Sequence, residues 1–159
     1  MKKLFFILLS IIIIFILSKC SKGYVEVIDE IENNNYRYQS LFLRIKTISA
    51  PYADFRIYYF IRDKKYYYHL YYPLEYNFLQ SEKNNLIIAY DTIKIYYTPI
   101  DVHIEDISNK QYQVAVFPCD KKDLLLLNNS SNTILRIKGR YAYNDYIVYG
   151  KVLPQLLEP

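Results

Sequence analysis

The chain has 159 residues, enough for one ordinary domain that buries a core without disulfide staples. Three of its 20 basic side chains lie within the first 19 residues, and the remainder carries 17 basic against 16 acidic side chains. A balance so close to neutrality gives no support for a nucleic-acid-binding role.

The first residues have the layout of an export signal. Lys2 and Lys3 precede an apolar run from Leu4 to Leu17, which only Ser10 interrupts. This order of a positive segment and an apolar segment is that of a secretory signal peptide. The apolar run is shorter than the roughly 20 residues that a helix needs to cross a bilayer. The pattern therefore predicts a signal peptide over residues 1–19 rather than a permanent span.

The end of this segment resembles a known processing site. Leu17, Ser18, Lys19 and Cys20 resemble the lipobox of bacterial lipoproteins, in which a signal peptidase cuts before a cysteine that carries diacylglycerol. Lys19 departs from the pattern, because a small residue normally precedes the cysteine. The resemblance covers the first 20 residues and implies a lipid at Cys20, anchorage to the inner or outer membrane, and a cell-envelope location facing the periplasm or exterior. An uncleaved amphipathic anchor and a soluble protein cut elsewhere are the alternatives.

The segment after the signal is expected to be a tether. Residues 20–35 include Gly23, an acidic stretch and three consecutive asparagines. A short strand or helix is an option around residues 24–31. Residues 36–159 are then expected to form a single β-rich domain, since they contain no internal repeat or low-complexity linker.

From Tyr36 onward the apolar residues recur with the period of two that a β-strand requires. Leu41, Leu43 and Ile45 share one side of such a strand. Turn residues and prolines divide the alternation into about 8 or 9 short strands, which indicates an all-β, antiparallel β-sandwich or small barrel. The expected strands lie near residues 36–48, 55–62, 66–72, 86–90, 93–97, 100–107, 111–117, 133–141 and 145–153.

One helix is expected near residues 120–128. Asp120 suits the N-cap, and Asp123 lies in the first turn, beside the positive end of the helix dipole. Leu124 to Leu127 supply the buried face. A buried strand is the alternative, because a short apolar run fits either structure.

A hairpin from Phe55 to Tyr72 is the best-defined candidate for a binding surface among the chain's 20 tyrosines. A turn around Asp63 and Lys64 would place Ile61 opposite Tyr66. The core face would then hold Phe55, Ile57, Tyr59, Ile61, Tyr66, Tyr68, Leu70 and Tyr72. The other face would carry the candidate binding patch: Arg56, Tyr58, Phe60, Tyr67, His69 and Tyr71. If exposed, this face suits stacking on a sugar ring or a partner's side chains; if covered, it is packing.

Three other features have a weaker pattern. Asp101, His103 and Glu105 share a strand face, but the two acids stand about 13 Å apart in a strand, beyond the spacing of a glycosidase pair. A zinc site needs three or four ligands, so a solvated polar face is expected. Cys119 has no intramolecular partner if Cys20 carries lipid, and a small buried hydrophobe is the simpler interpretation.

A row of cations on one predicted strand could attract anionic lipid headgroups or cell-wall polymers. Arg136, Lys138 and Arg140 form this row, and Arg44 and Lys46 could join it. Such rows are more often a solvated strand face or protection of a sheet edge.

The functional prediction is a lipid-anchored envelope protein with a non-enzymatic binding or structural role. No serine nucleophile motif, phosphate-binding glycine loop or paired-cysteine metal motif occurs in the sequence, which has three glycines. We therefore expect no cofactor and no metal. The expected partners are the membrane, through the N-terminal lipid, and a protein or glycan of the envelope. The alternative is an envelope hydrolase, or an inhibitor of an envelope enzyme, that uses His103 or His69.

Overall fold

The computed structural model describes residues 25–27, 35–48, 50–76, 85–139 and 142–157. The predicted signal peptide, Cys20 and most of the predicted tether lie outside these residues, and so does Arg140. Across the described ranges, no helix combines the length and the hydropathy that a membrane crossing requires.

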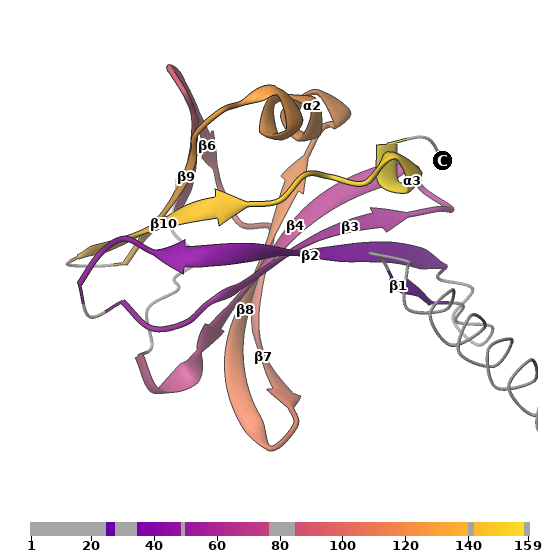
Figure 1. Cartoon of the computed structure of the whole chain (residues 1–159). Helices are drawn as coiled ribbons and strands as arrows, with labels where there is room; N and C mark the ends of the chain where they lie inside the picture. Colours follow the sequence, from indigo (N-terminus) through magenta and orange to yellow (C-terminus); the bar gives the residue numbers. More distant parts are fainter. Residues whose placement is uncertain (1–24, 28–34, 49, 77–84, 140–141, 158–159) are drawn as a thin grey trace, which may run out of the picture.

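The described chain folds into antiparallel strands with three short helical segments (Figure 1). The helical segments are α2 (Lys121–Asn129), α3 (Pro154–Leu157) and the 3₁₀ helix η1 (Leu74–Tyr76). The strands are β1 (Val25–Val27), β2 (Tyr36–Ile45), β3 (Asp54–Phe60), β4 (Lys65–Pro73), β5 (Leu86–Tyr90), β6 (Ile93–Tyr97), β7 (Asp101–Ile107), β8 (Lys110–Cys119), β9 (Thr133–Lys138) and β10 (Tyr143–Tyr149).

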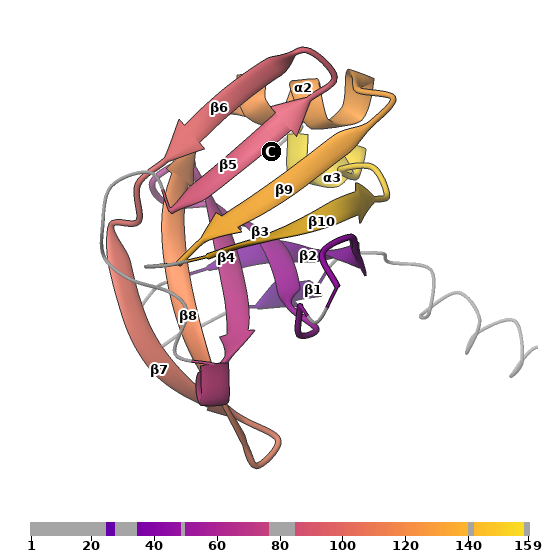
Figure 2. The ribbon, with the colours of Figure 1, turned by 90° about the vertical axis from the view of Figure 1, so that its left-hand side faces the viewer.

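The strand order is β6-β5-β9-β10-β2-β3-β4-β8-β7, with β1 paired to β2. β2 belongs to two layers, because Tyr36–Leu41 pairs with β3 whereas Phe42–Ile45 pairs with β10. We call β1, the first half of β2, β3, β4, β8 and β7 sheet A. The second half of β2 with β10, β9, β5 and β6 is sheet B, which crosses over sheet A in Figure 2. The predicted all-β class is confirmed.

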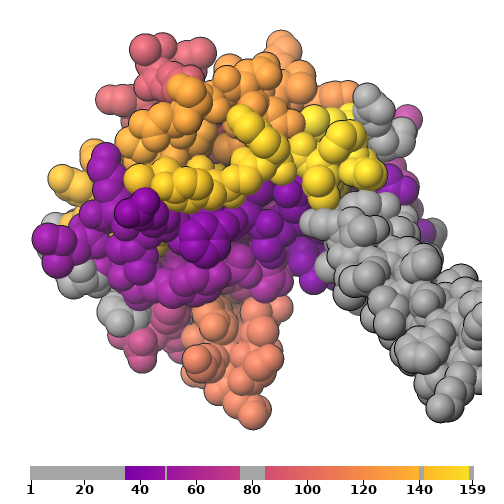
Figure 3. Space-filling model, viewed as in Figure 1, coloured from indigo at the N-terminus to yellow at the C-terminus, as the bar shows by residue number. Residues whose placement is uncertain are grey.

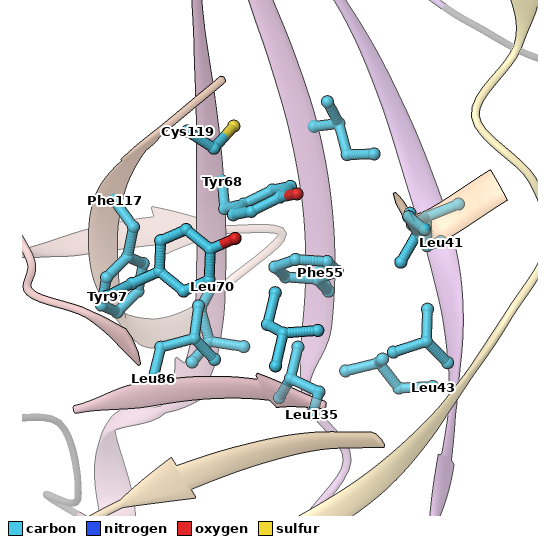
Figure 4. Packing of buried hydrophobic residues seen from close by; sticks show 14 of the residues in the cluster. Leu41, Leu43, Phe55, Tyr68, Leu70, Leu86, Tyr97, Phe117, Cys119 and Leu135 are labelled. Carbon is cyan, nitrogen blue, oxygen red and sulfur yellow. The ribbon is translucent and has the colours of Figure 1, made fainter. Parts of the chain in front are cut away.

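The core lies between the two sheets and is built from alternate residues of each strand. Phe55, Tyr68 and Leu70 face it from sheet A, and Leu86 and Leu135 from sheet B (Figure 4). Both α2 and α3 close one end of the core, to which they contribute two leucines each: Leu124, Leu127, Leu156 and Leu157. Each fully buried leucine or phenylalanine contributes about 1.5–3 kcal/mol.

The predicted elements agree with the observed ones to within a few residues. Strands over residues 86–90 and 93–97 form as predicted, and the helix expected near residues 120–128 is α2. Its N-terminus has the expected cap: the Asp123 carboxylate accepts a hydrogen bond from the Asp120 backbone N–H at 3.1 Å, as part of a capping box. In the predicted tether, Val25–Val27 pairs with Tyr36–Tyr38 as β1.

The register of the β3–β4 hairpin differs from the predicted one by two residues. Tyr59, not Ile61, lies opposite Tyr66, because the connection is a four-residue loop from Ile61 to Lys64. Lys64 has a φ of 53°, which lets the chain reverse after Ile61 has left the strand. A displacement by two residues preserves both faces, since side chains alternate with a period of two.

Candidate functional site

The six predicted patch residues lie together on the side of sheet A that faces away from the core. Arg56 lies opposite His69, and Tyr58 lies opposite Tyr67. The neighbouring β2 adds Tyr36 and Tyr38, which lie opposite Phe60 and Tyr58. These two tyrosines were not among the predicted site residues, because the sequence alone does not show which strands are neighbours. We call this set the outer aromatic face: Tyr36, Tyr38, Arg56, Tyr58, Phe60, Tyr67, His69 and Tyr71.

The rings of this face pack against one another. Tyr38 and Tyr58 are stacked with their centroids 5.1 Å apart, and Tyr58 stacks on His69 at 4.0 Å. Three nearly parallel rings therefore run across β2, β3 and β4. Phe60 extends this arrangement, because its ring is stacked with that of Tyr58 at 6.4 Å and contacts Tyr67 edge-on at 5.5 Å.

Arg56 is fixed at the centre of the face. Its Nε donates to the Asp54 carboxylate at 2.7 Å, and its guanidinium carbon lies 4.1 Å from the centroid of the Tyr71 ring and 5.6 Å from that of Tyr38. The Tyr58 and Tyr71 hydroxyls share a hydrogen bond of 3.0 Å. Burial and this bond raise the pKa of Tyr71 above its ordinary value, so the hydroxyl stays protonated.

The centre of the face is a second buried cluster, separate from the main core. Tyr58 is 7% exposed and Tyr71 3%, and Val114 of β8 is fully buried beside them, yet none of the three belongs to the core between the sheets. Tyr36, Tyr38, Phe60 and Tyr67 surround the centre and are partly exposed. The centre is therefore structural packing, and a partner would meet the four surrounding rings first: Tyr36, Tyr38, Phe60 and Tyr67.

His69 is held in its neutral form. Burial lowers its pKa to about 4, and electrostatic interactions with His103 and Arg56 act in the same direction. A neutral imidazole that stacks on Tyr58 adds to the packing and offers one donor and one acceptor.

The polar row on β7 is exposed, as expected, and holds one short contact. His103 Nδ1 lies 2.6 Å from the Asp101 carboxylate, whereas its Nε2 lies 4.0 Å from that of Glu105. His103 lies opposite Val114, which in turn lies opposite Tyr71, so both histidines lie on the outer side of sheet A. In the described ranges, no three of the residue types that ligate metals gather as a metal site. These contacts add no observation in favour of the hydrolase alternative.

Cys119 is a free, buried thiol at one end of the core, which agrees with its interpretation as a small buried hydrophobe (Figure 4). Burial raises the pKa of this thiol, and so do the nearby carboxylates of Asp123 and Asp120. A chain of hydroxyls, from Tyr68 to Tyr90 at 3.4 Å and on to Tyr97 at 3.3 Å, lies in the same core. These hydroxyls satisfy one another.

Comparison with known proteins finds little. No protein-family model matches the chain, and no curated protein matches it. The crystal structure of invasion associated protein B from Bartonella henselae is similar over 79% of this chain and 83% of that chain, with 9% sequence identity and a TM-score of 0.46. A similarity of this size defines no family.

Proposed function

We propose that this chain is a cell-envelope lipoprotein, tethered to a membrane through Cys20, whose β-domain binds a protein partner through the outer aromatic face. The observation that carries the binding role is the arrangement of this face: a buried Tyr58–Tyr71 centre with partly exposed aromatic side chains around it. The anchor is supported by the apolar run and lipobox-like end of residues 1–20.

A protein suits the outer aromatic face better than a glycan does. A sugar ring stacks on a free aromatic face, but Tyr38, Tyr58 and His69 direct their ring faces at one another. What such stacked rings offer to solvent is their edges and hydroxyl groups. Tyrosine edges and hydroxyls with an arginine among them are typical of the residues that dominate protein–protein interfaces.

The face is also ordered before any partner arrives. Arg56 is held by Asp54 and by two rings, and the Tyr58 hydroxyl is fixed by that of Tyr71. Association loses less side-chain entropy when the interface is already rigid. The same contacts that stabilise the fold therefore favour binding.

Site-specific photocrosslinking in intact cells of the source organism tests the binding role. A photoreactive phenylalanine analogue at Tyr67 should give a covalent adduct of one defined mass. The matched control carries the analogue at Tyr96, an exposed tyrosine of sheet B, and should not give this adduct. The Tyr38→Ser, Phe60→Ser double variant should lose the adduct and keep its circular dichroism spectrum. Equal adducts from both positions, or none from Tyr67, would overturn the proposal.

The anchor is tested separately. A Cys20→Ala chain should lose metabolic labelling by a radiolabelled fatty acid, and should move from the detergent phase to the aqueous phase on phase separation. Unchanged partition of the variant would count against the lipid at Cys20.

A further inference from the structure

Sheet B has an outer face of its own, which is aromatic and unusually exposed. Phe42 of β2 is 62% exposed and lies opposite Tyr149 of β10, with the ring centroids 6.2 Å apart. Tyr143 of β10 and Tyr96 of β6 are exposed on the same side. β2 and β10 run side by side along the surface in Figure 3. Exposed apolar groups that gather on one face mark an interaction surface.

The same face is basic. Arg44, Lys94 and Lys138 lie on it, and so does Arg136. Asp145 is the acidic residue on the strands of sheet B, and it is buried and bonded to Arg136 at 2.7 and 2.8 Å. That pair cancels, so the remaining cations leave the face positively charged.

An exposed apolar side chain lies in the loop that follows β2. Ile48, in the loop after β2, is 93% exposed. The loop is held in place by sheet B, since the backbone N–H groups of Lys46 and Thr47 both donate to the carbonyl of Asp145, at 2.9 and 3.2 Å. The exposed isoleucine thus directly follows a backbone segment that is bonded to β10 of sheet B.

The predicted anchor is close in sequence to the first described strand. Val25 begins β1, which pairs with the first half of β2. Five residue steps separate Cys20 from Val25 and span at most about 17 Å. A lipid at Cys20 would therefore hold the domain close to the bilayer.

We infer that the outer face of sheet B, with Ile48, is a membrane-contact surface for a bilayer with anionic headgroups. This inference rests on the anchor of the proposed function. Tyrosine and phenylalanine rings suit the headgroup region, cations bind anionic headgroups, and an exposed isoleucine can enter the boundary of the acyl chains. The outer aromatic face of sheet A then points away from the bilayer, toward a partner.

The absence of tryptophan from the chain allows a direct test with a single fluorescent side chain. Full-length Phe42→Trp and Ile104→Trp chains each carry one tryptophan, at positions of matched exposure, 62% and 57%. Ile104 lies on β7, at the far edge of sheet A, and serves as the control position. Each chain is incorporated into vesicles of phosphatidylcholine and phosphatidylglycerol.

The indole emission of the Phe42→Trp chain should shift to shorter wavelength in these vesicles and be quenched by brominated lipid. The emission of the Ile104→Trp chain should not change. The emission shift of the Phe42→Trp chain should be smaller in vesicles without phosphatidylglycerol. It should also be smaller when the Phe42→Trp chain carries Arg44→Gln and Lys138→Gln as well. Both changes remove the attraction between cations and anionic headgroups.

The outcomes separate the membrane contact from the anchor. If the two tryptophan chains sediment with vesicles but their emission responds alike, the membrane contact is overturned while the anchor stands. If the Phe42→Trp chain still shows its shift on vesicles after Cys20→Ala is added, the contact holds and the anchor is unnecessary for it. A chain that does not sediment with vesicles overturns both. The indole emission of the Phe42→Trp chain could instead shift with a soluble anionic polymer and not with vesicles. This result would show that the face binds such a polymer, and it would overturn the membrane-contact surface.

Discussion

At the scale of single residues, the outer aromatic face depends on two buried hydroxyls that satisfy each other. Tyr58 and Tyr71 are buried, and their hydroxyls bond at 3.0 Å. A buried polar group without a partner costs free energy, whereas removal of both partners can be nearly neutral. The hydrogen bond between Tyr58 and Tyr71 has a small net free energy, but losing one partner leaves the other hydroxyl buried and unpaired. The bond therefore favours the packing in which the two hydroxyls meet.

We expect the Tyr58→Phe variant to lower the free energy of unfolding by about 1–2 kcal/mol, because it leaves the Tyr71 hydroxyl without this partner. Tyr71→Phe should cost a similar amount, and the double variant should cost less than the two together. Urea unfolding of the parent chain, the two single variants and the double variant measures these losses. Tyr149→Phe, at an exposed tyrosine, is the control. Fully additive losses would show that the two hydroxyls are not coupled.

His69 makes the stability of the domain depend on pH. Its pKa is about 4 in the folded chain and about 6.5 when unfolded. The unfolded chain therefore binds more protons between these values, and the contribution of His69 to stability is lost as pH falls from 6.5 to 4. At about 1.4 kcal/mol per pKa unit, the loss is at most about 3.5 kcal/mol. Urea unfolding at several pH values in this range gives the slope of the free energy of unfolding against pH. This slope should be smaller for the His69→Gln variant than for the parent chain. Identical slopes would contradict the depressed pKa.

At the scale of elements, tight turns decide how the strands meet. The β7–β8 connection is formed by Ser108 and Asn109, which both have positive φ, 51° and 65°. Two consecutive positive φ values are typical of a type I′ turn, which matches the twist of a hairpin. The sequence predicts a reversal between the strands expected at residues 100–107 and 111–117, but not the turn type.

We predict that Asn109→Gly raises the free energy of unfolding by up to about 1 kcal/mol, because glycine adopts positive φ without strain. Asn109→Val should lower it, since a β-branched side chain resists this conformation. Thermal unfolding of the two variants checks the sign. A lower melting temperature for Asn109→Gly than for the parent chain would contradict this prediction. It would mean that the contacts of the asparagine side chain stabilise the turn by more than the strain of its positive φ destabilises it.

The alternation of side chains was sufficient to predict most strands and their faces, but not their places in the sheets. Leu43 and Ile104 both occupy core-side positions by period, yet Leu43 is buried and Ile104 is 57% exposed, because β7 is an edge strand of the described sheet. Nor does the period reveal that β2 pairs with different strands in its two halves. For the same reason Tyr36 and Tyr38 were not among the predicted patch residues, since β2 and β3 meet only in the fold.

At the scale of the whole molecule, the two sheets give the domain two different outer faces. The face of sheet A is self-packed and carries Asp54 and Arg56 as a neutralising pair, whereas that of sheet B is basic and exposed. The outer faces of two packed sheets point in opposite directions. One domain can therefore rest on a bilayer with one face and present the other to a protein partner.

The proposed orientation of the domain on a membrane depends on the anchor, so the chemical state of the mature amino terminus is its most direct test. The chain is purified from the envelope of its source and its N-terminal fragment is analysed by mass spectrometry. We predict a fragment that begins at Cys20 and carries the added mass of a diacylglycerol group. A fragment that begins at Met1, or an unmodified Cys20, would contradict the account.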